Sequence, residues 1–241
     1  MNIIFGIRAV LEAIKANQEI DKILVNNKLS GELAGELFAE VRKNNIFVQN
    51  VPAEKINSIT KSNHQGVVAY ISPIQYSDIE TVIQNLQESK KNPLFVILDQ
   101  ITDVRNFGAI ARTCECANVD AIIIPKHGSV RITEDAIKTS AGALFNIPVC
   151  RVNNLTDAVF LLKQYDIRIV AVTEKTNNEI YTCDLTQATA LIFGSEDLGI
   201  SKQLLKNSDT QVKIPMFGKT DSLNVSVSAA IAVYECVRQR K

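Results

Sequence analysis

The chain has 241 residues and equal numbers of basic and acidic side chains, 26 of each, so its formal net charge is zero. This balance gives no overall basic field of the kind that indicates a general nucleic-acid binder, although it is compatible with a local basic patch. Hydrophobic residues make up 46% and charged residues 22%, which is typical of a globular protein. No run approaches the roughly 18 apolar residues of a membrane span, and no signal-peptide pattern opens the chain. We therefore expect a cytoplasmic protein without a membrane partner.

The sequence does not indicate a metal site or a hydrolytic triad. Its five cysteines are odd in number and lie mostly in apolar runs, so we expect reduced and buried thiols. Cys114 and Cys116 lie within a helical pattern and have no second cysteine pair or nearby histidine to complete a zinc site. The two histidines, His64 and His127, lie in different regions, which gives a Ser-His-Asp triad little support.

Residues 3–71 alternate between helical and strand patterns over a length sufficient for a small α/β domain. Apolar spacing predicts helices over residues 6–17, 32–43 and 54–59. Apolar runs predict strands over residues 22–25, 46–48 and 66–71. Residues 73–93 differ in texture, with one amphipathic helical pattern and then a polar run, and we predict that they form a linker. The domains are then residues 1–72 and 94–241.

The second region is dominated by continuous apolar runs. Residues 94–98 read Leu-Phe-Val-Ile-Leu, as expected for a strand buried on both faces. Comparable runs follow at residues 121–124, 167–172, 190–193 and 212–214. Helical patterns cover residues 106–117, 134–140, 155–165, 201–206 and 224–240. This alternation predicts an α/β domain with a parallel sheet covered on both faces.

Three segments rich in small and polar residues lie where a strand pattern gives way to a helical one, at residues 103–112, 193–201 and 222–233. Open α/β sheets bind ligands at such turns, so we expect one composite pocket. Asn106 is a candidate helix N-cap, and Gly108 permits close approach by a ligand or a neighbouring strand. Arg112, taken alone, is more simply a salt-bridged surface residue. Neither a G-x-G-x-x-G fingerprint nor a Walker loop occurs, which opposes a nucleotide-dependent oxidoreductase.

Together these segments resemble the signature motifs of the SpoU (TrmH-like) RNA ribose methyltransferases. The motifs are Asn106-x-Gly108-x-x-x-Arg112, Gly194-Ser195-Glu196-x-x-Gly199, Ile214-Pro215-Met216 and Ser222-Leu223-Asn224-Val225-Ser226. The resemblance covers residues 94–241 and implies a parallel-sheet domain tied in a trefoil knot. Residues 5–10 and 64–69 resemble the small α/β, ribosomal-protein-like RNA-binding domain that precedes it in one branch of the family.

The resemblance implies that S-adenosylmethionine donates a methyl group to the 2′-hydroxyl of a ribose in RNA, without a metal ion. The branch with the extra domain includes the enzyme for a guanosine of large-subunit ribosomal RNA, and this chain looks most like that member. Transfer RNA as substrate, or a non-catalytic factor that binds ribosomal RNA, remain the alternatives. Relatives are homodimers. The last helix offers a candidate interface, although burial within one chain explains the same residues equally: Val227, Ala230, Ile231, Val233 and Tyr234.

The resemblance assigns catalysis to Arg112, Asn106, Glu196 and Asn224. Arginine stays protonated at neutral pH, so we expect Arg112 to bind phosphate and to stabilise charge on the ribose oxygen. Asn106 would orient the hydroxyl, and Glu196 would hold Asn106 or Arg112, with Ser226 completing the network. Simple capping and loop support remain open for Glu196 and Ser226. The cofactor would be held by Thr173, Gly194, Ile214, Leu223 and Asn224.

The first motif departs from the family at one point. Many relatives have proline after its aspartate, whereas this chain reads Asp103-Val104-Arg105. Loss of proline is expected to free the backbone ahead of Asn106. The added Arg105 is a candidate phosphate contact.

Overall fold

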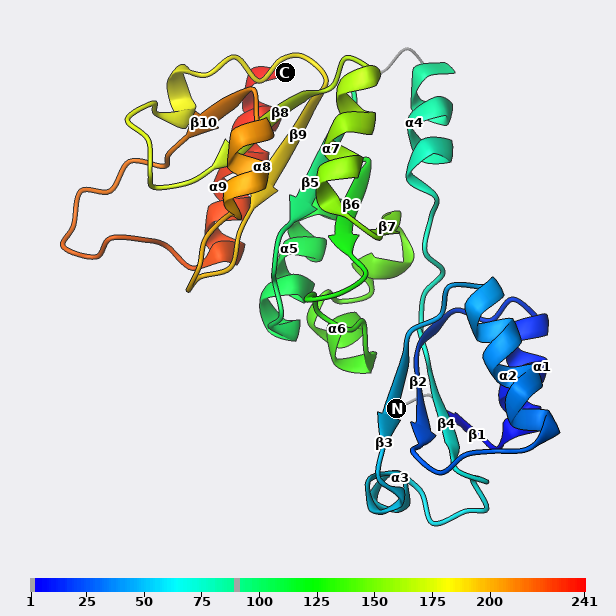
Figure 1. Ribbon diagram of the computed structural model, residues 1–241. Coiled ribbons are helices and arrows are strands. Elements are labelled where there is room, and N and C mark those ends of the chain that lie inside the picture. Colours follow the sequence, from blue (N-terminus) through cyan, green and yellow to red (C-terminus); the bar gives the residue numbers. More distant parts are fainter. Residues whose placement is uncertain (1–2, 89–91) are drawn as a thin grey trace. The chain divides into compact units, whose positions relative to one another are not determined.

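The computed structural model describes residues 3–88 and 92–241. The chain divides into two compact units, Met1–Gln75 and Tyr76–Lys241 (Figure 1). The boundary falls inside the segment that the sequence predicted as a linker. Most of that segment, including a helix, belongs to the second unit.

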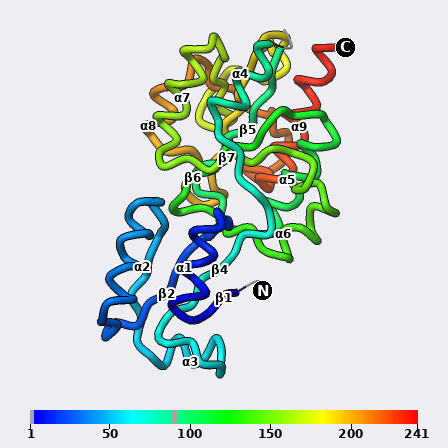
Figure 2. Tube along the Cα trace, turned by 90° about the vertical axis from the view of Figure 1, so that its right-hand side faces the viewer, coloured from blue at the N-terminus to red at the C-terminus, as the bar shows by residue number. Residues whose placement is uncertain are grey.

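The first unit contains a four-stranded sheet with the order β1-β4-β2-β3. Its strands are β1 (Ile3–Phe5), β2 (Ile20–Asn26), β3 (Val48–Val51) and β4 (Val67–Ile71). Strand β4 runs antiparallel to β1 and β2, and β3 runs parallel to β2. Helices α1 (Ile7–Lys15) and α2 (Glu32–Lys43) lie side by side on one face, and α3 (Ala53–Ile59) covers the other (Figure 2). Successive residues of β2 therefore alternate between the two cores, with Ile23 and Val25 under α1 and α2 and Leu24 under α3.

The two N-terminal motif segments adjoin each other in this unit. Phe5 pairs with Val68, and the Gly6 N–H donates to the Val67 carbonyl at 3.1 Å. The Ile7 N–H donates to Gln65 Oε1 at 3.2 Å, so a side-chain amide satisfies one of the free N–H groups at the start of α1. Gly6 has φ 92°, a backbone conformation that side-chain-bearing residues rarely adopt.

The second unit contains six parallel strands in the order β10-β8-β9-β5-β6-β7, which confirms the predicted parallel sheet. The strands are β5 (Leu94–Leu98), β6 (Ala121–Pro125), β7 (Val149–Val152), β8 (Arg168–Val172), β9 (Thr189–Phe193) and β10 (Thr210–Val212). All five residues of β5 and all five of β9 are buried, as expected for central strands covered on both faces. The carboxyl ends of the six strands meet at one edge of the sheet.

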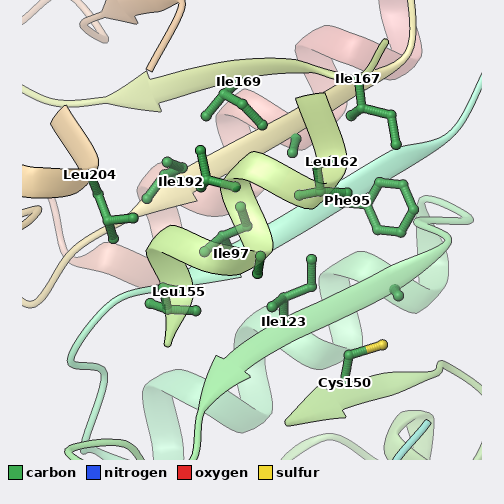
Figure 3. Packing of buried hydrophobic residues seen from close by; sticks show 14 of the residues in the cluster. Phe95, Ile97, Ile123, Cys150, Leu155, Leu162, Ile167, Ile169, Ile192 and Leu204 are labelled. Atoms are coloured by element: carbon green, nitrogen blue, oxygen red, sulfur yellow. The ribbon is translucent and has the colours of Figure 1, made fainter. Parts of the chain in front are cut away.

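Helices cover both faces of this sheet (Figure 1). One face carries α4 (Ile79–Glu88), α7 (Leu155–Gln164) and α8 (Lys202–Asn207). Figure 3 shows the core beneath α7, where Leu155 and Leu162 meet Phe95 and Ile97 of β5. On the other face α5 (Val104–Cys116) contacts α9 (Val225–Gln239), with α6 (Glu134–Thr139) beside α5. Two short 3-10 turns, Ala143–Phe145 and Ile180–Thr182, complete the unit.

The structure corrects several predicted elements. The strand expected at residues 46–48 is Val48–Val51, and Phe47 before it is 41% exposed. The strand expected at residues 212–214 is Thr210–Val212. Strands β1 and β7 were not predicted, and both lie at sheet edges. Ile83 of α4 is 1% exposed within the core of the second unit, so α4 is part of that unit.

Among the described residues, the structure shows no helix with the length and apolar character needed to cross a membrane. All five cysteines are free. Burial raises the pKa of the Cys114, Cys150 and Cys236 thiols to about 12, so they stay protonated near neutral pH. Cys116 is exposed and Cys183 is half-buried, so the expectation of buried thiols holds for three of the five.

Candidate active site

A pocket of about 330 Å³ opens at the carboxyl ends of β8 and β9. Its walls are the ends of these strands, the loops at residues 194–200 and 213–224, and the first turn of α9. This edge of a parallel sheet is where α/β proteins bind ligands. Four of the five predicted cofactor residues line the pocket: Thr173, Gly194, Ile214 and Leu223. The fifth, Asn224, directly precedes the lining residue Val225.

Gly194 lets the first of these loops fold back on itself. A Cβ on Gly194 would lie 2.1 Å from the Gly199 carbonyl carbon and 2.2 Å from the Ile200 nitrogen, so no side chain fits there. The Gly199 N–H donates to the Ser195 carbonyl at 2.8 Å, and Gly199 itself has φ 69°. The tight return leaves Glu196 exposed at the pocket.

Asp99 supports this loop from the end of β5 and was missed by the sequence reasoning. Asp99 is 6% exposed, and its carboxylate accepts a hydrogen bond from the Ser201 N–H at 2.8 Å. Its own N–H donates to the Phe193 carbonyl at 2.8 Å. The signal was an acidic residue directly after a strand buried on both faces, since a buried carboxylate needs partners.

Asn106, Glu196 and Asn224 form one hydrogen-bonded network. Glu196 Oε1 accepts from Asn106 Nδ2 at 3.2 Å, from Asn224 Nδ2 and from the Val225 N–H at 3.4 Å. Asn224 Nδ2 also donates to Asn106 Oδ1 at 3.0 Å. Asn224 Oδ1 caps α9 by accepting from the Ser226 N–H at 2.9 Å and from the Ser226 hydroxyl. The network joins the starts of α5 and α9 to the loop at residues 194–200.

Arg112 lies outside this network. It is exposed, its side chain forms no hydrogen bond or ion pair with any residue in the described part of the chain, and it is not a lining residue of the pocket. It follows Asn106 by six positions on α5, a rotation of about 120° around the helix axis. Arg105 is also exposed and lies seven positions before Arg112, hence on nearly the same side of the helix. The prediction that Arg112 forms a surface salt bridge is therefore not supported, because no acidic partner lies among the described residues.

Helix α5 begins earlier than predicted, and Asn106 is not its N-cap. The cap is Asp103, whose carboxylate accepts from the Arg105 N–H at 2.7 Å and the Asn106 N–H at 2.9 Å. Val104 takes the first helical position, where proline is favoured in general. The backbone ahead of Asn106 is therefore helical rather than freed by the missing proline. Because Asp103 caps the helix, the side-chain amide of Asn106 is available to Glu196.

Gly108 serves helix packing instead of ligand approach. A Cβ there would lie 2.7 Å from Thr139 Cβ and 3.1 Å from the Ser140 nitrogen, at the end of α6. The expected close approach to Gly108 is therefore present, but the neighbour is helix α6 and not a ligand or a strand.

Two family models together match most of the chain. The model for RNA 2′-O ribose methyltransferase substrate binding matches residues 3–77. The SpoU rRNA methylase model matches residues 93–234, more than half of the sequence. The chain belongs to the SpoU family. It is an RNA methyltransferase, and its cofactor is S-adenosylmethionine.

Relatives of this SpoU protein extend over its whole length. A TrmH family tRNA/rRNA methyltransferase of Staphylococcus saprophyticus is 36% identical over 238 residues, which are 99% of this chain and 96% of the relative. Its counterpart in Staphylococcus aureus is 34% identical over the same shares. The structure of the SpoU methyltransferase AviRb from Streptomyces viridochromogenes, in complex with AdoMet, has a TM-score of 0.63 and 25% identity over 99% of this chain and 90% of that one. The TrmH/SpoU tRNA modifying enzyme of A. aeolicus has a TM-score of 0.57 and 28% identity over 67% of this chain and 84% of its own.

The pocket suits the family's cofactor. Its volume lies within the range of small-molecule clefts, and Ile214 and Leu223 give it apolar walls for an adenine ring. The carboxylates of Glu174, Asp197 and Asp221 also line it and match the positive charges of a sulfonium and an ammonium group. Among the described residues, no group of three or more His, Cys, Asp and Glu side chains is placed to hold a metal ion.

Proposed function

We propose that this protein methylates the ribose 2′-hydroxyl of a guanosine in large-subunit ribosomal RNA. The observation that carries the proposal is the Asn106–Glu196–Asn224 network, because it sets three polar side chains from separate motifs beside the cofactor pocket. The substrate-binding match over residues 3–77 supports RNA as the partner.

Bound S-adenosylmethionine supplies a methyl group on a sulfonium, whose leaving group is a neutral thioether that needs no acid. The task left to the chain is to align the hydroxyl and to remove its proton. In this proposal the Asn106 amide orients the hydroxyl, and Glu196 with Asn224 fixes the amide. Alignment at roughly 3 Å can contribute several kcal/mol to the rate. The network thus contributes to the rate by holding the ribose hydroxyl in position.

Arg112 is assigned to the RNA backbone in the same proposal. Its exposed guanidinium is free of partners in the described residues, and its planar fork matches two phosphate oxygens. Held there, it stabilises negative charge on the ribose oxygen. The hydroxyl proton then passes to a phosphate oxygen or to water, since arginine stays protonated.

The choice of ribosomal over transfer RNA rests on the branch of the family that carries the N-terminal domain. The staphylococcal relatives are named for both substrates. The test is to map ribose methylation across ribosomal and transfer RNA in a strain that lacks this gene, and to restore the missing mark with purified protein. Loss of a single guanosine mark in large-subunit RNA is expected. Loss of a transfer-RNA mark instead would reassign the substrate.

We also propose that the protein is a homodimer that pairs through α9. Val227 is 46% exposed and Tyr234 is 49% exposed, with Ala230 and Ile231 half-buried between them. Val233 is fully buried within the chain, so it is removed from the predicted interface.

We further propose that the chain forms a trefoil knot around the pocket. Strand β10 lies at the edge of the sheet, next to β8. The chain then crosses back from this edge to form α9, which contacts β9 and α5, and this return path supports the proposed knot.

A further inference from the structure

Three exposed apolar side chains border the cofactor pocket. Phe217 is 95% exposed, Leu198 is 68% exposed and Met216 is 38% exposed. Leu198 and Met216 also line the pocket, and Phe217 directly follows Met216. The three residues come from the two loops that form the pocket walls, and we refer to them as the apolar rim.

We propose that the apolar rim binds an unstacked base of the RNA substrate, with Phe217 as the surface on which the base stacks. The proposal rests on the RNA methyltransferase function proposed above and adds a residue that positions the target nucleotide.

The fold gives Phe217 no packing role. A Cβ on the next residue, Gly218, would meet nothing within 4 Å, so the loop is open to solvent here. A phenylalanine side chain offers about 150–250 Å² for burial, and almost none of it is used within the chain. Large exposed apolar surface beside a binding pocket indicates a contact with another molecule.

The reaction itself limits what that molecule is. The ribose hydroxyl must come within roughly 3 Å of the methyl carbon held in the pocket. The base on that ribose, or on the next one, then lies at the border of the pocket, where the rim is. Bases in loops and single strands are the ones that proteins read by splaying them out and stacking them on aromatic rings. An RNA base therefore fits the rim by position and by chemistry.

Charged side chains of both signs lie near the rim. Lys219, two residues after Phe217, is exposed and forms no ion pair with any residue of the described ranges 3–88 and 92–241. Lys175 also borders the pocket, where its Nζ lies 3.9 Å from Glu174 Oε1. The lining residues Asp197 and Asp221 carry the opposite charge, so the proposal rests on the exposed ring beside the pocket and not on the local charge.

A second copy of the chain is the competing occupant of the rim. A stable interface needs roughly 800 Å² from each partner. Three side chains, the largest of which offers about 150–250 Å², supply only part of that area. The rim is therefore assigned to RNA, and an effect on assembly becomes an outcome of the test.

The first experiment measures single-turnover methylation of an in vitro transcript of large-subunit ribosomal RNA at saturating S-adenosylmethionine. Phe217→Ala is expected to raise the RNA concentration for half-maximal rate by roughly five- to hundredfold, the effect of losing one base–aromatic stack. Phe217→Tyr keeps the ring and should stay near wild type, whereas Phe217→Leu should behave like the alanine variant. Phe160→Ala is the matched control, because Phe160 is a 49% exposed aromatic residue on α7. Cofactor affinity by calorimetry should be unchanged in all four variants.

The second experiment does not depend on turnover. The chain has no tryptophan, so Phe217→Trp introduces a single indole, whose fluorescence should be quenched when the transcript is added. Wild-type RNA affinity for Phe217→Ala or Phe217→Leu, or an unquenched indole, would overturn the proposal. So would conversion of a dimer to a monomer by Phe217→Ala in sedimentation. Quenching without methylation by the wild type would instead remove the proposed reaction and leave the RNA contact in place.

Discussion

Asn106 and Glu196 lie 90 positions apart in the sequence, and the amide of the first donates to the carboxylate of the second at 3.2 Å. The same carboxylate oxygen accepts from Asn224, which starts the last helix. Three motifs that look independent in the sequence therefore depend on one acceptor atom. Removal of that oxygen should therefore change the positions of side chains in all three motifs.

Glu196→Ala removes this acceptor, so Asn106 and Asn224 lose their common anchor. Turnover is expected to fall by roughly ten- to hundredfold, on the scale of a misplaced reacting group. Glu196→Gln keeps an oxygen that can accept the same hydrogen bonds and should retain more of the rate. The measurement is single-turnover methylation at saturating RNA and cofactor. Equal rates for all three proteins would reduce Glu196 to loop support.

Arg112→Ala should separate the two interpretations of this residue. Because Arg112 is exposed and has no partner in the described residues, its removal should change the free energy of unfolding by less than about 0.5 kcal/mol. Turnover should fall by roughly a hundredfold or more, the effect of losing one electrostatic stabiliser. Arg112→Lys should rescue poorly, since a point charge does not reproduce the planar fork.

The Arg112 variants are compared by single-turnover kinetics and denaturant unfolding, with calorimetry for the cofactor. Cofactor affinity should stay constant, because Arg112 is not a lining residue of the pocket. A wild-type rate for Arg112→Ala would remove it from the catalytic group and leave Asn106 as the main positioning residue.

Gly194→Ala should disrupt the pocket. The added methyl would overlap the backbone of Gly199 and Ile200, at 2.1 and 2.2 Å, so the loop must move. We expect a stability loss of about 1–3 kcal/mol, as in other overpacked sites, together with loss of cofactor binding. Gly218→Ala is the control, since nothing lies within 4 Å of its Cβ position. Calorimetry and thermal unfolding of the two variants decide the matter, and tight cofactor binding by Gly194→Ala would contradict the role given to this loop.

Truncation tests the division of labour between the two units. A chain of residues 76–241 keeps α4 and should bind S-adenosylmethionine, while its RNA binding should be weaker than that of the whole chain. A chain of residues 94–241 loses Ile83 from the core and should be destabilised by at least roughly 2 kcal/mol, the cost of one large buried side chain. RNA binding is measured by filter retention and stability by urea unfolding. If residues 76–241 bound RNA as tightly as the whole chain, the first unit would not be the RNA-binding part.

The proposed dimer is tested on the exposed side of α9. Val227→Asp combined with Tyr234→Asp places two charges in the proposed interface and should convert a dimer to a monomer of 26.6 kDa. Phe160→Asp is the control, because Phe160 matches Tyr234 in exposure and lies on α7. Analytical ultracentrifugation gives the mass. A dimer that survives the double substitution must pair through another surface.

The pattern of apolar residues along the sequence made much of the fold predictable. The run Leu94–Leu98 is a strand over those same residues, because a short continuous apolar run is typical of a strand in a sheet covered on both faces. Edge strands lack that signature. In β7 the apolar run is interrupted by Arg151, and β1 has only three residues.

The motifs indicated that Asn106, Glu196 and Asn224 would lie together, but not how they are arranged. Asp103 and Asn106 are both good N-caps, and only the packed helix decides that the aspartate takes the position. The hydrogen bonds of Asn106 and the outward orientation of Arg112 follow from that start. Gly108 likewise required the position of α6, which local sequence does not contain.

Asn224 and Ser226, which complete the network, lie far along the chain from the first unit, which ends at Gln75. During synthesis the first unit is therefore finished some 150 residues before the site can close. At about 5–20 residues per second that interval is roughly 8–30 s. The N-terminal unit is thus fully synthesised well before a nascent chain can transfer a methyl group.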